Sequence, residues 1–261
     1  MHLIDSHCHL DFPVFRDQLD AVMQQALTAG VADIVVPGVC AADWPRLLSL
    51  VEHKHPAMRL HPALGLHPCF MQQHREEDLE QLQQALQAGG ICALGEIGLD
   101  LFIADADLER QLAFLQPQLA LADRFRLPVL LHVRKAHDQM LKQLRRQSLA
   151  RGGIVHAFSG SAQQAAQYLD LGFRLGIGGT ITYERATKLR GLVKTLPLEA
   201  FVLETDAPDM PLAAYRDEPN QPARVLQVAQ TLADLRGVTL QEVAAQTTAT
   251  TRQLLGLDQK E

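Results

Sequence analysis

Two histidines separated by one residue stand near the start of the chain, in the segment Asp5-Ser6-His7-Cys8-His9. Residues two apart on a β-strand point to the same face, so His7 and His9 could bind one divalent metal ion together. The apolar pair Leu3 and Ile4 just before them is typical of a strand. Alone, such a pair is weak evidence, because it also arises by chance on protein surfaces.

Four further residues of metal-binding type stand at or near the ends of other short apolar runs. Glu96 is flanked by glycines, which allow close approach of the backbone. The others are His132, His156 and Asp206. A single histidine in such a place is usually a hydrogen-bonded core residue. Together, four histidines and two carboxylates predict a centre of two divalent metals around a reactive water, with Glu96 as the best candidate to bridge them.

Other residues near these ends follow less specific patterns. His67, in Gly65-Leu66-His67-Pro68, could bind substrate or only pack in the core. Arg134 closely follows His132 and could neutralise a phosphate. Glu204 shares the face of Asp206 by the two-residue period, so it could support that residue or contact substrate. The remaining histidines of note we assign to surface or loop positions: His53, His55, His61 and His74.

Short apolar runs and longer helical patterns alternate along the whole chain. The runs predict eight strands, at residues 2–5, 33–37, 59–66, 91–97, 128–133, 153–156, 174–177 and 201–204. Helices are expected at 14–29, 42–53, 76–88, 108–124, 136–149, 162–171, 184–195 and 223–236, with a last one at 240–255. Pro117 predicts a kink or break in the fourth helix. Since no linker interrupts the alternation, one α/β domain spanning residues 1–261 is expected.

The spread of the candidate ligands indicates how the strands are arranged. They follow the first, fourth, fifth, sixth and eighth predicted strands. In a doubly wound open sheet, the alternative, these ends would be strung along one edge. In a closed barrel of eight parallel strands they converge on one mouth, where active sites of that fold are built. The pattern therefore favours a (β/α)8 TIM barrel.

Composition excludes some functions and locations. The formal net charge of −6 argues against a broad basic surface for nucleic acid, although bound divalent cations would offset part of it. No apolar run approaches the roughly 20 residues of a membrane span, and no secretory leader is apparent. We therefore expect a cytoplasmic protein that has no membrane contact. The four cysteines show no metal or disulfide spacing, so reduced thiols are expected.

At these residues the sequence resembles the TatD family of metal-dependent hydrolases and deoxyribonucleases, within the amidohydrolase-like barrels. The motifs recur in the family's order: the histidine pair, Gly65-Leu66-His67-Pro68, Gly95-Glu96-Ile97-Gly98-Leu99-Asp100, Leu131-His132, His156-Ala157-Phe158-Ser159-Gly160-Ser161 and Glu204-Thr205-Asp206-Ala207-Pro208. The resemblance implies that one metal would be held by His7, His9 and Asp206, the other by His132 and His156, with Glu96 bridging. Departures from the family pattern affect loops around the mouth: Leu101-Phe102-Ile103, Ala157 and Asp217-Glu218-Pro219.

The resemblance implies a deoxyribonuclease that cleaves phosphodiester bonds of DNA, with Glu96 and Asp206 as its catalytic residues and no obligate protein partner. A small-molecule amidohydrolase, esterase or lactonase with the same two-metal site is the alternative, and a metal-binding protein without catalysis is a third reading. Many such barrels bridge their metals with a modified lysine, and no lysine ends a predicted strand here. The metals could be zinc, manganese or magnesium, and imidazole ligands favour a transition metal.

Overall fold

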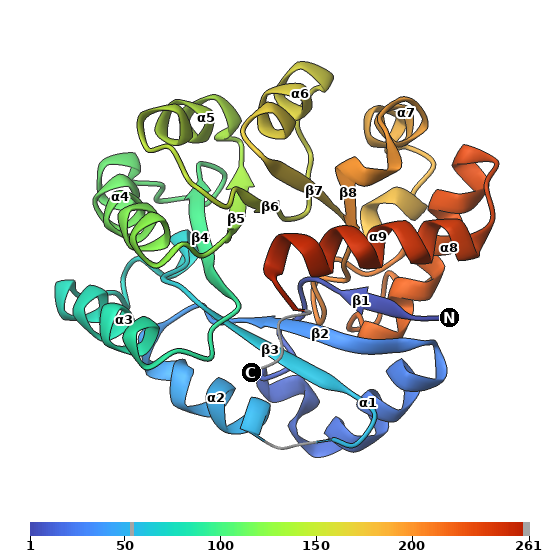
Figure 1. Ribbon diagram of the computed structural model, residues 1–261, viewed down its shortest axis with the longest axis horizontal. Helices are drawn as coiled ribbons and strands as arrows, with labels where there is room; N and C mark the ends of the chain where they lie inside the picture. Colours follow the sequence, from blue (N-terminus) through green and yellow to red (C-terminus); the bar gives the residue numbers. More distant parts are fainter. Residues whose placement is uncertain (53–54, 258–261) are drawn as a thin grey trace.

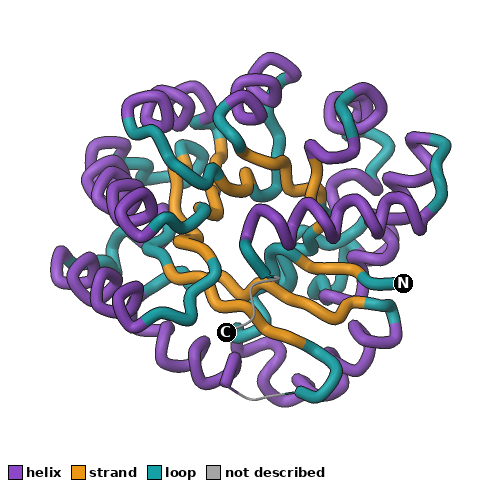
Figure 2. The backbone as a smooth tube through the Cα atoms, viewed as in Figure 1, coloured by secondary structure: helices purple, strands orange, loops and turns teal. Residues whose placement is uncertain are grey.

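Eight parallel strands form one sheet whose spatial order follows the chain, from β1 to β8, in this computed structural model. The structure describes residues 1–52 and 55–257, so His53 lies outside the described residues. Figures 1 and 2 show the strands as an inner ring with helices around it. The strands are β1 (Leu3–Asp5), β2 (Val31–Pro37), β3 (Arg59–Leu64), β4 (Ala93–Asp100), β5 (Val129–Arg134), β6 (Gly153–Val155), β7 (Phe173–Ile177) and β8 (Phe201–Leu203).

Hydrogen bonds between the first and last strands close the ring. Ser6 N donates to Leu203 O at 2.9 Å, and two further backbone bonds of 2.8 Å join residues 7–9 to residues 206–207. The buried Asp5 carboxylate accepts from the amide N of Thr205 at 2.9 Å and from its hydroxyl at 2.6 Å. The barrel prediction is therefore confirmed, and the open-sheet alternative is wrong.

Helices cover the outside of the barrel between successive strands (Figure 1). Within the described ranges they are α1 (Leu19–Thr28), α2 (Trp44–Glu52), α3 (Glu76–Ala88), α4 (Leu108–Phe125), α5 (His137–Arg146), α6 (Ala162–Asp170), α7 (Thr187–Thr195), α8 (Val225–Arg236) and α9 (Leu240–Leu255). Several bounds differ from expectation, since α5 ends at Arg146 instead of residue 149 and α7 begins at Thr187 instead of residue 184. Residues 13–18 form a 3₁₀ turn before α1, and α4 passes through Pro117 without a break because apolar residues on both sides bury the same face. None of these helices is both long and apolar enough to cross a membrane.

A small apolar cluster fills the barrel interior on the amino-terminal side of the candidate ligands, and we call it the apolar floor. Six of its members come from strands, and the seventh comes from the end of α9: Val35, Ala63, Ala93, Leu130, Ile154, Val202 and Leu255. Side chains two residues apart face the same side of a strand. The next inward positions after Leu130 and Ile154 are therefore His132 and His156, which stand directly above the floor. Burial of the apolar layer thus sets the height and direction of these two imidazoles.

An irregularity in β4 turns Glu96 into the barrel. The pairing of β4 with β5 shifts register between Leu94 and Ile97, and the strand continues to Asp100 instead of ending near Ile97 as expected. Gly95 lies so close to β5 that an added Cβ would be 2.6 Å from the Cβ of Leu130. Only glycine permits this approach, so the local sequence and the register shift together place Glu96 in mid-strand, facing inward.

A second buried carboxylate, Asp33, stabilises the opposite, amino-terminal end of the barrel. Its oxygens lie 2.6 Å from His2 Nε2, 2.7 Å from His61 Nε2, 2.8 Å from Arg59 Nε and 3.5 Å from an Arg252 nitrogen. Burial raises the pKa of Asp33, but the hydrogen bonds from His61, Arg59 and His2 outweigh it and hold the pKa well below its usual range. The assignment of His61 to a surface or loop position is therefore wrong, because it lies in β3 and binds this carboxylate.

Replacing this carboxylate should lower the stability of the fold. In Asp33→Asn we expect a loss of about 1–3 kcal/mol near pH 7, because the hydrogen bonds from His2, Arg59 and His61 would lose the charge of their acceptor. A depressed carboxyl pKa stabilises the fold above the unfolded-state value of 3.8, and that stabilisation is lost as pH falls towards the folded-state pKa. Urea unfolding at pH 7 and pH 3 should therefore show a smaller difference between variant and wild type at pH 3. The exposed Asp20→Asn is the control, and an equal difference at both pH values would contradict the prediction.

Candidate metal centre

Ligand-type side chains from six strands meet above the apolar floor, at the carboxyl ends of the strands. Within the described residues, four groups have ligand atoms within 4.8 Å of one another: His7 with His9 and Glu96, His7 with His156 and Asp206, Glu96 with His132 and His156, and His67 with Cys69 and His132. The structure thus brings together all six residues that the sequence singled out as metal ligands. Four of the six are buried, whereas the side chains of Asp206 and His132 are 13% and 18% exposed.

Glu96 is at the middle of the cluster, and its two oxygens face different histidines. Oε2 lies 3.1 Å from His7 Nε2 and 3.4 Å from His9 Nε2. Oε1 lies 3.1 Å from His67 Nε2 and 3.0 Å from His132 Nδ1. Burial raises the pKa of Glu96, but its interactions with the surrounding histidines, those with His67 and His7 first, outweigh burial and hold the pKa well below its usual range. An ionised carboxylate with each oxygen facing a separate pair of rings has the arrangement of a bridging ligand.

Asp206 lies across the same gap from a different strand. Its Oδ1 is 3.7 Å from His7 Nε2 and 3.6 Å from His9 Nε2, and its Oδ2 is 3.6 Å from His156 Nε2. Burial raises the pKa of Asp206 to about 6, although the nearby His156 and His9 act in the opposite direction. Its backbone is left-handed, with φ of 59°, which aspartate tolerates better than most residues. Asp206 is thus the most accessible carboxylate of the cluster.

Three of the imidazoles are oriented by a partner on the side away from the centre. His9 Nδ1 lies 3.2 Å from Pro37 O and His132 Nε2 lies 2.8 Å from Asp100 Oδ2, both as hydrogen bonds. His156 Nδ1 lies 3.2 Å from Glu204 Oε1, which is an ion-pair contact without hydrogen-bond geometry. A ring that donates its outer N–H, as those of His9 and His132 do, presents the lone pair of its other nitrogen to the centre. The partners therefore select the tautomer that can bind a metal.

This donor set fits divalent metal ions. His9 Nε2 lies 3.4 Å from Glu96 Oε2 and 3.6 Å from Asp206 Oδ1, and although burial lowers the pKa of His9, these carboxylates outweigh it and raise the pKa. The carboxylates therefore favour a positive charge at this position, which a metal ion would supply. Imidazole nitrogens with carboxylate oxygens are ligands that zinc, manganese and iron accept. The carboxylate charges and the imidazole nitrogens that face them thus form a set of ligands for a divalent metal ion.

His67 occupies the same cluster in a different role. Its Nδ1 accepts the backbone N–H of Cys69 at 3.1 Å, so the neutral ring carries its proton on Nε2. Burial lowers the pKa of His67 to about 4, which favours this neutral form. The Nε2–H then points at Glu96 Oε1, 3.1 Å away. Of the two readings that the sequence left open, packing inside the protein fits better, because His67 holds the central carboxylate by a hydrogen bond.

The sequence reading missed the part played by Asp100, which is fully buried at the end of β4. Besides its contact with His132, its carboxylate accepts the backbone N–H groups of Phe102 at 2.7 Å and Ile103 at 3.2 Å. Hydrogen bonds from His132 and Phe102 outweigh the effect of burial and keep its pKa well below the usual range. The sequence did contain an indication of this role, because Asp100 lies an even number of residues after Glu96 on the same strand and so shares its face.

Two other assignments are corrected by burial. His74 is 3% exposed, and its Nε2 lies 2.9 Å from His67 O, so it is an internal support and not a surface residue. Glu204 is fully buried, and its Oε1 accepts the Ala157 N–H at 2.6 Å. Its carboxylate packs where Gly176 has no side chain, so it supports His156 and does not reach a substrate.

A cavity of about 580 Å³ opens above the cluster; we call it the mouth cavity. Aromatic side chains line it beside the metal-binding groups: Phe12, Phe70 and Phe158. Arg134 also lines it, with an exposed guanidinium. The mouth cavity therefore offers substrate an apolar wall, one cation and direct access to Asp206.

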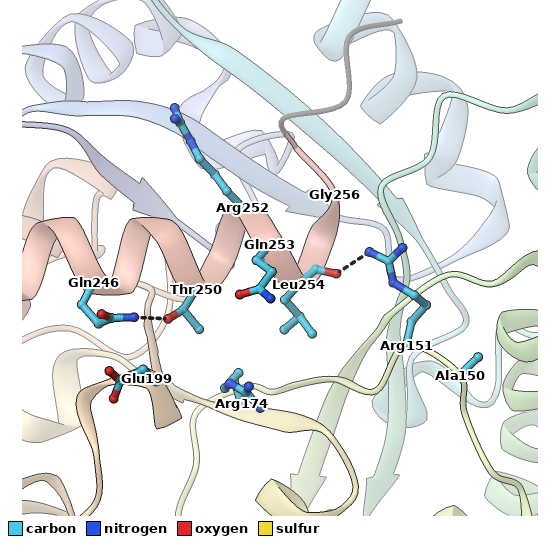
Figure 3. Close-up of a pocket in the computed structure, with 10 residues that line it drawn as sticks. All are labelled: Ala150, Arg151, Arg174, Glu199, Gln246, Thr250, Arg252, Gln253, Leu254 and Gly256. Carbon is cyan, nitrogen blue, oxygen red and sulfur yellow. Dashed lines mark hydrogen bonds between the residues drawn. The ribbon is translucent and has the colours of Figure 1, made fainter.

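Another cavity, of about 550 Å³, lies at the other end of the barrel (Figure 3). Its lining comes from residues before β6 and β8 and from the last turns of α9, and includes Arg151, Arg174 and Glu199. Arg151 donates to Leu254 O at 3.0 Å. None of the histidine and carboxylate groups that could hold a metal among the described residues lies here. The candidate site is therefore the mouth cavity.

Comparisons with known proteins agree with this geometry. Residues 4–256 match the family model described as TatD related DNase. The chain is 46% identical over 243 residues to the metal-dependent hydrolase YjjV of Escherichia coli K12, covering 92% of this chain and 93% of that protein. The crystal structure of YjjV superposes with a TM-score of 0.92 and covers 97% of each chain.

More distant proteins extend the comparison. The 3'-5' ssDNA/RNA exonuclease TatD of Erwinia amylovora is 32% identical over 262 residues, covering 98% of this chain and all of that protein. A phosphotriesterase homology protein from Escherichia coli shares the fold at 13% identity, with a TM-score of 0.59 over 78% of this chain and 82% of that chain. The match over nearly the whole length, together with the cluster at the mouth, establishes that the chain belongs to the TatD family of metal-dependent hydrolases.

Proposed function

We propose that this hydrolase cleaves phosphodiester bonds of DNA with two divalent metal ions. One observation carries the proposal: the two oxygens of Glu96 face separate sets of imidazoles, and Asp206 lies across both sets. His7, His9 and Asp206 would hold one ion, His132 and His156 the other, and Glu96 would bridge. When bound, such ions supply positive charge for phosphate oxygens and a water of lowered pKa.

The protein's own side chains orient the imidazoles of the metal centre and accept the proton of the attacking water. Pro37 O and Asp100 hydrogen-bond the outer nitrogens of His9 and His132, so each of these rings keeps its other nitrogen towards the centre throughout the reaction. Glu204 Oε1 lies 3.2 Å from the outer nitrogen of His156. His67 Nε2–H keeps Glu96 in place. Asp206, whose pKa burial raises to about 6, is the accessible carboxylate that accepts the proton of the attacking water at an Oδ atom.

Two observations favour a phosphodiester over an amide. The described residues that line the mouth cavity include no lysine, so the modified-lysine bridge of many amide-cleaving barrels has no counterpart here. Arg134 at the rim supplies a permanent cation for a phosphate. The name of the Erwinia relative, an exonuclease of single-stranded DNA and RNA, points to the same class of substrate.

The size of the mouth cavity supports the second candidate function. A volume of about 580 Å³ falls within the range of about 300–1,000 Å³ typical of small-molecule sites. A small ester, amide or lactone could therefore be the substrate of the same metal centre. The two candidates share every metal ligand and differ only in what fills the mouth.

Removing the charge of the bridging carboxylate should abolish hydrolysis. In Glu96→Gln we expect at least about 100-fold lower kcat/KM on single-stranded DNA and on bis(p-nitrophenyl) phosphate, because a neutral amide cannot bridge two cations. Circular dichroism should show an intact fold, and elemental analysis should show fewer than two metals per chain. Full activity of Glu96→Gln on DNA would contradict the proposal. Wild-type turnover of small esters without cleavage of DNA would favour the second candidate.

The metal should be a transition metal. Four imidazole ligands suit zinc, manganese or iron, whereas magnesium prefers a shell of oxygens. We expect protein purified without added metal to contain zinc or another transition metal by mass spectrometry. Removal with a chelator should abolish activity, and the same metal should restore it. A metal-free preparation that is active with magnesium alone would show this expectation to be wrong.

Asp100 should tune metal affinity through His132. Asp100→Asn keeps an oxygen for the backbone donors but loses the charge that fixes the His132 ring, so we expect about 10- to 100-fold weaker binding of the metal. Competition with a chromogenic chelator measures this directly. Asp105→Asn changes an exposed carboxylate in the same loop and should leave affinity unchanged. Equal affinity of Asp100→Asn and wild type would remove the role assigned to Asp100.

A further inference from the structure

An aromatic side chain at the rim of the mouth cavity is left open to solvent. Phe102 is 57% exposed, one of three large apolar side chains so exposed among residues 1–52 and 55–257. The guanidinium carbon of Arg134 lies 3.9 Å from the centre of its ring. A cation at this distance over an aromatic face is attracted to it. The two side chains form one surface, which we call the rim pair.

The rim pair is held in a fixed position relative to the metal centre. Asp100 accepts the Phe102 N–H at 2.7 Å through Oδ1, while its Oδ2 lies 2.8 Å from His132 Nε2. Leu101 N donates to Arg134 O at 2.9 Å, and Asp100 pairs with Arg134 in the β4–β5 register. The same carboxylate therefore positions both a predicted metal ligand and the backbone of the exposed aromatic ring.

A packing role alone does not account for this arrangement. A ring that served only to stabilise its loop would be expected to lie against apolar side chains, whereas more than half of Phe102 is open to water. Within the described part of the chain, Arg134 makes no ion pair with an acidic side chain. Its N–H groups thus remain available while its flat face lies on the ring. The rim pair offers an apolar stacking face and a cation side by side.

We propose that the rim pair binds an unpaired nucleotide of the substrate strand, with its base stacked on the face of Phe102 that Arg134 leaves uncovered and a neighbouring phosphate paired with the guanidinium. This inference rests on the proposed function, since it takes the substrate to be nucleic acid. Aromatic and guanidinium faces bind bases of any sequence, but only when the base is not already stacked within a duplex. With a net charge of −6 the protein has little general attraction for DNA, so a local contact of this kind would select single strands and strand ends.

Binding without cleavage tests the proposal. In an Asp206→Asn background, fluorescence anisotropy would compare a labelled five-nucleotide thymidine strand with an abasic strand of equal length and charge. We expect tighter binding of the thymidine strand. Adding Phe102→Ala should weaken that binding by about 5- to 150-fold and leave the abasic strand unaffected, the range measured for loss of one base–aromatic stack. Arg134→Ala should weaken both strands, because it also removes a phosphate contact.

The control is Arg146→Ala, an exposed arginine at the far end of α5, which should change neither strand. If Phe102→Ala binds the thymidine strand as tightly as its parent does, the proposal is overturned. Turnover separates this inference from the proposed function. If wild type cleaves DNA and Phe102→Ala has an unchanged KM for it, the rim pair is refuted and the nuclease stands. If wild type cleaves no DNA, the nuclease and the substrate role of the rim pair are both refuted, and a preference for the thymidine strand that is lost in Phe102→Ala would leave the rim pair as a nucleotide-binding surface only.

Discussion

A buried carboxylate in the barrel interior is the constraint on which the rest of the site depends. Glu96 is 1% exposed, and an ionised group without water is costly unless cations or hydrogen-bond donors surround it. Imidazoles from four other strands supply that environment. Each of them has to arrive at the same height, which requires a closed barrel, an apolar floor beneath and hydrogen bonds behind the rings. The charge of Glu96 therefore requires the surrounding imidazoles and the hydrogen bonds that hold them in place.

Each end of the barrel stabilises a buried carboxylate, but the cationic side chains around that carboxylate differ between the two ends. At the amino-terminal end, Asp33 contacts the imidazoles of His2 and His61, but also the guanidinium groups of Arg59 and Arg252, which remain charged at any relevant pH and bind no metal. At the mouth, Glu96 is surrounded by imidazoles, which carry a lone pair when neutral and can give it to a metal ion. The first arrangement is permanent and stabilises the fold. The second can exchange its cation, and that property makes chemistry possible there.

The support of the rings also connects the centre to its rim. Asp100 contacts His132 on one side and the backbone of Phe102 on the other, so the proposed substrate surface and the proposed metal site share one carboxylate. Glu204 acts similarly on His156 while its other contact is the Ala157 N–H, in the loop that continues to the mouth. Substrate preference can therefore change in these loops while the metal ligands stay in place, which fits the departures from the family pattern at residues 101–103 and 157.

The sequence by itself determined the eight strands, the closed barrel and the six residues that converge on its mouth. Local rules sufficed, because side chains two apart share a face and the ends of parallel strands meet at one edge. The role of His67, the burial of His74 and the part played by Asp100 required the tertiary structure. Each depends on a partner such as His132, 32 residues from Asp100, that no local pattern identifies. The inward turn of Glu96 likewise arises from a register shift between two strands, and pairing between strands is decided only when the whole barrel closes.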